Sequence, residues 1–195
     1  MILYFDTETT GIRPGRIIQL SYIMDHGAFL KCKNFYFAVD YIEPGAQAVH
    51  GISVEKLKVL SKGLTFGDHI DEISDDFSAA DMLVAHNFKF DLSFMSAEFS
   101  YYDRVFRYNA YLDTMRYFTP ILKIERANGG YKYPKLTELK DFAEIYDYDV
   151  TRFAMKNFDD EAGYFHDARF DTASMYLSCE KMKDENEELY GLLKP

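Results

Sequence analysis

The sequence contains little cysteine, and this scarcity excludes several kinds of protein. Cys32 and Cys179 are the only two cysteines in 195 residues, too few and too far apart for a zinc site of ordinary spacing or for a disulfide framework. A reducing compartment suits such a chain, so we expect a cytoplasmic protein. The opening MILYFDTETTG turns acidic too early for a signal peptide. No apolar run is long enough to cross a bilayer, so we expect no membrane partner.

The sequence also has fewer basic than acidic residues. The chain has 22 Lys and Arg against 32 Asp and Glu, which gives a formal net charge of −10. This balance argues against a protein that coats long nucleic acid electrostatically. It leaves room for an enzyme that holds a few phosphates through metal ions. Tryptophan is absent, but 48% of the residues are hydrophobic, enough for one domain with a sizeable core.

The order of apolar segments indicates an α/β fold. Runs at 2–5, 16–24 and 34–39 predict three strands in an antiparallel meander. Helices are expected after Ser53 and at 66–77, 88–99, 114–118, 136–146 and 168–182, with strands at 82–85 and around 111–112 and a loop at 121–135. Strands first and then alternating helices and strands predict a mixed sheet. We expect one domain over residues 1–183 and a solvated acidic tail over residues 184–195.

Asp6 and Glu8 stand two residues apart at the end of the first expected strand. Side chains alternate along a strand, so both carboxylates project to the same side. Two adjacent carboxylates repel each other, and a hard divalent cation with oxygen ligands would relieve that repulsion. Taken alone, the pair is a weak signal, because such a pair at the end of a strand is far more often part of a solvated turn. Gly11 would let the backbone come close to a ligand or would simply form a turn.

Two further segments carry polar residues at the starts of expected helices. His86 and Asn87 follow the strand at 82–85, where ligand sites of α/β proteins usually lie. Asp91 is spaced four residues from Asn87, on the same helical face, although Asn87 could also serve as a helix cap. In the third segment we expect His166 on a loop, Asp167 at the cap and Asp171 in the first turns of the helix.

Together these segments resemble the DnaQ-like exonuclease family, which has four acidic residues and a histidine. DTETTG, HNFKFD and HDARFD occur in the order of the family's three motifs, at residues 6–11, 86–91 and 166–171. AVHGIS at 48–53, LDT at 112–114 and KLTEL at 135–139 are also similar to family segments. The resemblance runs over nearly the whole chain and implies a ribonuclease H-like fold, a five-stranded mixed sheet flanked by helices.

The resemblance also implies a mechanism, namely 3′→5′ hydrolysis of phosphodiester bonds with two Mg²⁺ or Mn²⁺ ions to release nucleoside 5′-monophosphates. The implied metal ligands are Asp6, Glu8, Asp91 and Asp171. His166 would take the proton of the attacking water. The implied contacts to the terminal nucleotide are Thr9, Gly11, Ile12, His50 and Asn87.

The motifs leave the substrate and the partner open. The DTETTG form favours the proofreading branch, and therefore the 3′ end of single-stranded DNA, with a polymerase subunit as a further candidate partner. An RNA-trimming exoribonuclease would carry the same five catalytic residues. A catalytically inactive nucleic-acid-binding module is a third alternative, but it would be marked by loss of a ligand carboxylate, and all are present.

Overall fold

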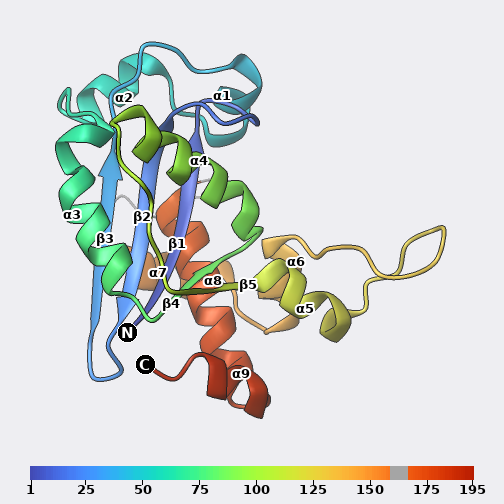
Figure 1. The fold of residues 1–195 in the computed structure, drawn as a ribbon. Helices are drawn as coiled ribbons and strands as arrows, with labels where there is room; N and C mark the ends of the chain where they lie inside the picture. The colour runs from blue at the N-terminus through green and yellow to red at the C-terminus, as the bar shows by residue number, and fades with distance from the viewer. Residues whose placement is uncertain (159–166) are drawn as a thin grey trace.

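The computed structural model describes residues 1–158 and 167–195. In this part of the chain, five strands form one sheet in the order β3-β2-β1-β4-β5 (Figure 1). β1 (Ile2–Thr9), β2 (Ile17–Asp25) and β3 (Leu30–Tyr36) form an antiparallel meander. β4 (Met82–Ala85) and β5 (Ala110–Asp113) continue the sheet in parallel with β1. The predicted α/β class and the mixed sheet are thus confirmed.

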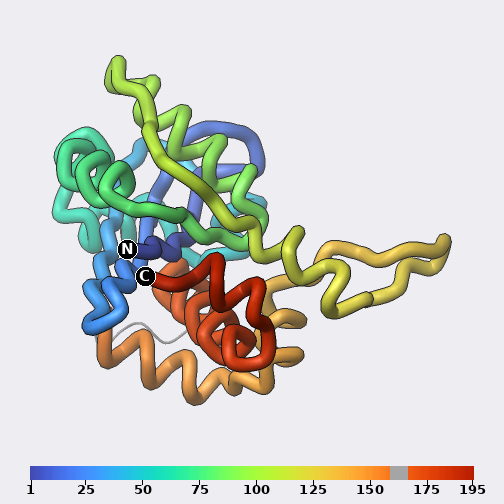
Figure 2. Tube along the Cα trace, turned by 60° about the horizontal axis from the view of Figure 1, so that its bottom comes forward, coloured from blue at the N-terminus to red at the C-terminus, as the bar shows by residue number. Residues whose placement is uncertain are grey.

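Helices cover both faces of this sheet (Figures 1 and 2). The described helices are α1 (Pro44–His50), α2 (Val54–Leu60), α3 (Phe66–Ala79), α4 (Phe88–Tyr101), α5 (Thr114–Leu122), α6 (Leu136–Phe142), α7 (Asp147–Asn157), α8 (Ala168–Lys183) and α9 (Glu187–Leu192). Ser53 accepts a hydrogen bond from the Lys56 amide, which confirms it as the N-cap of α2. None of these helices has the length and apolar character needed to span a membrane.

The alternation of side chains along β1 divides the core into two layers. Leu3 and Phe5 pack in a cluster with α3 and α4. Ile2 and Tyr4 pack on the opposite face, in a cluster that includes Met175 of α8. The same alternation continues to the end of β1, so it also decides which helix the polar residues there will meet.

β3 lies earlier in the chain than the predicted 34–39. The turn after β2 is tight, with Gly27 at a φ of 79° and the His26 amide donating to the Phe29 carbonyl over 3.1 Å. β3 therefore begins at Leu30, opposite Asp25. It ends before Phe37, and the amide of Ala38 donates instead to the carbonyl of Leu64, outside the sheet.

The final residues pack onto the domain, so the expectation of a solvated tail over 184–195 is wrong. Leu189 and Leu193 are fully buried in the cluster that contains Met182. Asn186 caps α9, because its side-chain oxygen accepts the Leu189 amide at 2.9 Å. The acidic residues of this stretch lie on its outer side, while leucines four apart make the inner side.

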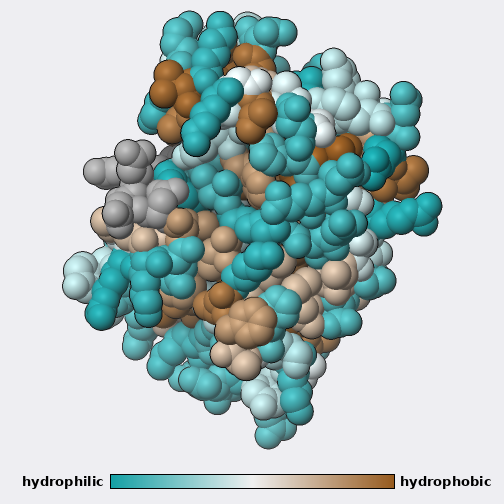
Figure 3. All heavy atoms as spheres, turned by 90° about the vertical axis from the view of Figure 1, so that its left-hand side faces the viewer, coloured by the Kyte–Doolittle hydropathy of each residue, from teal (hydrophilic) through white to brown (hydrophobic). Residues whose placement is uncertain are grey.

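The predicted helix at 136–146 ends four residues early, and a second helix that was not predicted follows it. α6 ends at Phe142, where Glu144 adopts a positive φ of 56°, and α7 starts at Asp147. Lys140 stabilises this corner, since its ammonium lies 2.9 Å from Asp141 and 3.0 Å from Asp147. On the face shown in Figure 3, hydrophilic side chains dominate and hydrophobic ones occur in small separate groups.

Candidate active site

Three carboxylates meet at the end of β1. Asp6 and Glu8 project to the face covered by α8, because they continue the alternation begun by Ile2 and Tyr4. Asp171, in the first turn of α8, joins them there. A carboxylate oxygen from each of the three lies within 4.8 Å of the other two. Asp6 and Asp171 are half-buried, and all three residues line a cleft through which a ligand can reach them.

Asp91 lies beside this group rather than within it. It comes from α4 on the opposite face, is 2% exposed, and accepts a hydrogen bond of 2.7 Å from the Thr7 hydroxyl. Thr7 points toward α4 because it lies between Asp6 and Glu8 on the strand. Asp91 is close enough for its charge to raise the pKa of Asp6. The structure thus brings together all four of the predicted carboxylates, three closely and one from the side.

Burial and crowding make these carboxylates weak acids. Burial raises the pKa of Asp6 well above its ordinary range, and the charges of Asp91, Asp171 and Glu8 add to the effect. Burial, with Asp171 next, likewise raises the pKa of Glu8. Burial raises the pKa of Asp91 and of Asp171 to about 7; the Thr7 hydrogen bond opposes the rise for Asp91. A divalent cation would remove this repulsion, and an all-oxygen donor set suits Mg²⁺ or Mn²⁺.

Gln19 holds the start of α8 in place. Its side chain is fully buried in β2, donates to the Asp167 carboxylate at 3.0 Å, and accepts from the Ala168 amide at 3.3 Å. Asp167 itself caps α8 by accepting the Arg169 amide at 2.9 Å, as the sequence predicts. His166, the predicted general base, lies outside the described residues. Gln19 was not among the predicted site residues; its sequence signal is an amide within the otherwise apolar start of β2.

A cleft of about 280 Å³ opens above the carboxylates. Its walls are formed by Asp6, Thr7, Glu8, Thr9, Gly11, Ile12, Gly45, Ala46, Val49, His50, Phe90 and Asp171. Four of the predicted substrate contacts are among them: Thr9, Gly11, Ile12 and His50. Ile12 is 83% exposed and Val49 is 56% exposed. The cleft therefore has a carboxylate floor and an apolar rim.

Asn87, the fifth predicted contact, lies outside the residues that line the cleft. It occupies the N-cap position of α4 in a left-handed conformation, with φ 70°, and its side chain makes no capping hydrogen bond. Its backbone amide donates to the Asp113 carboxylate at 3.2 Å. Asn87 therefore occupies the cap position that the alternative assigned to it, without a capping hydrogen bond from its side chain. A substrate contact for Asn87 stays a prediction.

The loop after β1 forms one rim of the cleft, and backbone contacts hold it. The Thr9 hydroxyl donates to the Gly11 carbonyl at 2.8 Å, and the Thr10 amide donates to the Arg16 carbonyl at 2.9 Å. A Cβ on Gly11 would lie 2.5 Å from the Glu43 carboxylate. The lack of a side chain at Gly11 thus makes room for Glu43, just ahead of α1.

The exonuclease family model RNase_T matches residues 3–152, well over half of the chain. The chain therefore belongs to this family and is a DnaQ-like exonuclease, a nucleic-acid hydrolase. Asp171 and α8 lie beyond the matched residues, so their place in the site rests on the structure.

Among curated proteins, the chain is similar to the DNA polymerase III subunit epsilon of Rickettsia felis and to that of Rickettsia conorii. Each is 35% identical over 107 residues, which cover 50% of this chain and 44% of the relative. The chain thus matches less than half the length of these relatives.

Proposed function

We propose that the chain hydrolyses phosphodiester bonds at nucleic-acid 3′ ends, in the 3′→5′ direction, with single-stranded DNA as its substrate. The products are nucleoside 5′-monophosphates. The observation that carries this proposal is the group of Asp6, Glu8 and Asp171 at the floor of the cleft, with Asp91 beside it. The DNA substrate is supported by the printed names of the two relatives.

Divalent cations complete the proposed site. Asp6, Glu8 and Asp171 offer oxygen ligands within 4.8 Å of one another, and Asp91 is a fourth carboxylate at hand. We propose two Mg²⁺ or Mn²⁺ ions there. When bound, such ions acidify water and neutralise charge that develops on phosphate oxygens.

The chain's own residues bind and orient the strand. Ile12 and Val49 present exposed apolar surface at the rim, which can stack against a terminal base without regard to sequence. Thr9 and Gly11 provide polar backbone and hydroxyl groups on the same side. His50 lines the cleft from the end of α1, where its Nδ1 accepts the Ile52 amide at 3.1 Å. Asn87 is a proposed contact outside this lining.

His166 is the proposed acceptor of the water proton, on the evidence of its sequence position one residue before the cap of α8. His166→Ala should lower single-turnover hydrolysis by roughly 10²–10⁴, the usual effect of losing a general base. Its affinity for Mn²⁺, measured by calorimetric titration, should stay close to that of the unchanged chain. A loss of affinity as large as that of Asp171→Ala would show that His166 is instead a metal ligand.

The proposed activity is tested by digesting 5′-labelled single-stranded DNA, duplex DNA and short RNA with Mg²⁺ or Mn²⁺. Shortening of the labelled strand from its 3′ end, fastest on single-stranded DNA and abolished by EDTA, is the expected result. Asp6→Asn should reduce the rate by roughly 10²–10³ or more, because it removes charge next to the reacting groups. Asp184→Asn, an exposed change at the end of α8, is the matched control. Full hydrolysis in EDTA would overturn the metal site, and faster cleavage of RNA would overturn the DNA substrate.

A polymerase subunit is the proposed protein partner, because both relatives are named as subunits of DNA polymerase III. The test is gel filtration of the chain mixed with the polymerase catalytic subunit of the same organism. Co-elution at micromolar concentration is expected, and separate elution would overturn this partner.

A further inference from the structure

Residues 123–135, here called the basic arm, carry a charge opposite to that of the rest of the molecule. They hold four of the chain's 22 Lys and Arg residues and one of its 32 Asp and Glu residues. The basic arm therefore has a formal charge of +3, and the remainder of the chain has −13. Such a concentration of positive charge on an acidic protein indicates a surface that binds a polyanion.

The basic arm has a defined hairpin conformation and projects from the body of the protein (Figures 1 and 2). Glu125 and Tyr131 form an antiparallel bridge, and the Lys132 amide donates to the Ile124 carbonyl at 2.8 Å. The turn between the two sides uses Gly129 and Gly130, both at positive φ, a conformation that glycine adopts freely. The hairpin thus presents its side chains to solvent on a formed backbone.

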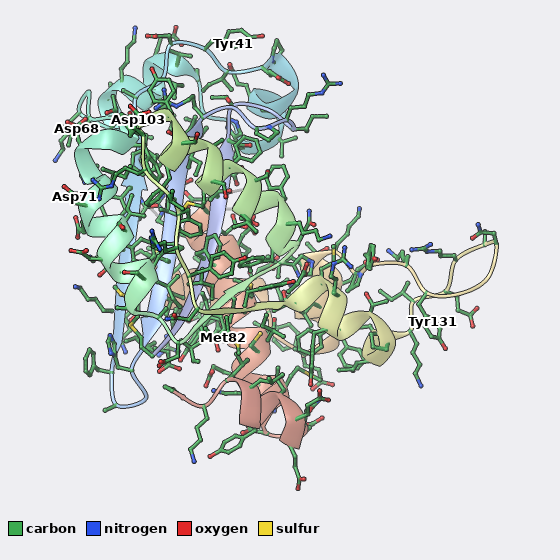
Figure 4. The ribbon with its side chains drawn as sticks, viewed as in Figure 1. Tyr41, Asp68, Asp71, Met82, Asp103 and Tyr131 are labelled. Carbon is green, nitrogen blue, oxygen red and sulfur yellow. The ribbon has the colours of Figure 1, made fainter. Side chains whose placement is uncertain are left out.

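Tyrosines alternate with the cations of the basic arm. Tyr131 and Tyr133 are 43% and 46% exposed, and Tyr131 lies on the hairpin away from the sheet (Figure 4). The Arg126 guanidinium lies 6.0 Å from the centre of the Tyr133 ring, and that of Arg116 lies 5.5 Å from the same centre. Exposed aromatic rings flanked by guanidinium groups are suited to stacking on bases while the cations meet phosphates.

Three cations of the basic arm, Lys123, Arg126 and Lys135, are exposed and available to a ligand. Lys132 is engaged by Glu138. For Lys123, Arg126 and Lys135, the described part of the chain shows no salt bridge. They can therefore neutralise phosphates without first breaking an internal pair.

Pro134, at the base of the basic arm, contacts His86, which follows β4 at the end of the sheet where the cleft lies. His86 Nε2 lies 3.0 Å from the Pro134 carbonyl oxygen, which can only accept, so Nε2 carries the proton. His86 directly follows β4, whose parallel neighbour β1 ends at the carboxylates Asp6 and Glu8.

We propose that the basic arm binds the phosphates and bases of a nucleic-acid strand several nucleotides upstream of the 3′ end in the cleft. This inference rests on the proposed function and extends it to the length of substrate that the protein holds. Nucleic acid fits better than an acidic protein, because the hairpin alternates cations with exposed rings and is fastened beside the cleft.

The test compares Lys123→Gln/Arg126→Gln with the control Lys31→Gln/Lys181→Gln. The control removes the same charge from exposed lysines near the opposite end of β1. Binding of a fluorescent 20-nucleotide and a 4-nucleotide single strand is measured in Ca²⁺ at several KCl concentrations. Each phosphate that the protein neutralises on a single strand changes the slope of log affinity against log salt by about 0.7, because bound counterions are released.

The arm variant should bind the 20-mer roughly 5–10-fold more weakly, with a slope less steep by about 1.4. Its ratio of 20-mer to 4-mer affinity should fall, whereas the control should match the unchanged protein. Equal slopes and affinities for the arm variant and the control would overturn the inference and point to an acidic protein partner. Hydrolysis of the 4-mer in Mg²⁺ reports on the cleft alone. If the unchanged protein fails to hydrolyse it, the proposed function itself is overturned.

Discussion

Burial, and then the charge of Asp167, raise the pKa of the Asp171 carboxyl to about 7. In an unfolded chain the pKa of an aspartate is about 3.9. The folded protein therefore binds this proton more tightly than the unfolded chain does. The resulting stabilisation is fully present below about pH 4 and is lost as the pH rises through about 7.

Asp171→Asn should therefore stabilise the metal-free protein at alkaline pH. In EDTA at pH 8, its Tm should exceed that of the unchanged chain by roughly 2–5 °C, and the difference should shrink as the pH is lowered to 5. Added Mn²⁺ should raise the Tm of the unchanged chain and have little effect on the variant. Parallel melting curves at every pH, with or without Mn²⁺, would contradict the repulsion on which the metal site depends.

Gln19 acts on the site through the start of α8. Gln19→Leu removes its bonds to Asp167 and Ala168 and should cost about 1–3 kcal/mol of stability, because buried polar groups are left unpaired. The hydrolysis rate should fall with little change in KM, since α8 carries Asp171 and follows His166. Urea unfolding and steady-state kinetics measure the two effects.

Ser21→Ala is the control for Gln19, because it belongs to the same polar network. Ser21 donates to Asn34 at 2.6 Å, and Gln19 donates to the same oxygen at 2.9 Å. This change should reduce stability and leave the hydrolysis rate near normal. An equal loss of rate in both variants would show that the network only supports the fold.

At the scale of elements, α9 and its C-cap stabilise the domain through two buried leucines, Leu189 in the helix and Leu193 at the cap. Leu189→Ala should lower the free energy of unfolding by about 2–5 kcal/mol, as for other fully buried leucines. Leu192→Ala on the same helix removes a side chain that is 36% exposed and should have a much smaller effect. Urea denaturation of both variants would decide the matter, and similar midpoints would show that α9 is only loosely packed.

Segments with a regular apolar period were predictable from the sequence, and segments without one were not. β4 matches its prediction at both ends, because a short apolar run between polar turns has one clear assignment. α1 has no buried residue, and its sequence has no regular spacing of large apolar residues that would predict a helix. Its signals are Pro44 in the first turn and Gly51 at the left-handed C-cap, and we did not use them.

The candidate site also has contacts that a local sequence rule predicts and contacts that no such rule predicts. Asp6 and Glu8 could be paired from the sequence, since alternation along a strand is local. The contact between Gln19 and Asp167 spans 148 positions, and no local rule shows it. The Glu43 carboxylate next to Gly11 likewise depends on where α1 packs.

For the whole molecule, residues beyond the family match at 3–152 complete both the core and the site. α8 packs on β1 and β2 and covers Ile2, Tyr4 and Ile23. A chain ending at residue 158 should therefore lack a cooperative unfolding transition in urea, because one face of the sheet would be exposed. A chain ending at residue 184 keeps α8 and should unfold cooperatively, at lower urea than the full chain. Cooperative unfolding of the shorter chain would show that the matched segment is a domain by itself.

β1 pairs with β4 and packs against α8, so the carboxylate site joins segments that lie far apart in the sequence. Asp6 and Glu8 are near the start of the chain and Asp171 is near its end, so the cluster closes only when the longest loops have closed. Contacts of this range form late and slowly, because the entropy of closing the loop is lost before the contact stabilises it. During refolding, helical signal should return before Mn²⁺ binding does. We therefore expect partly folded forms of the chain to lack the carboxylate cluster, and with it the proposed metal site.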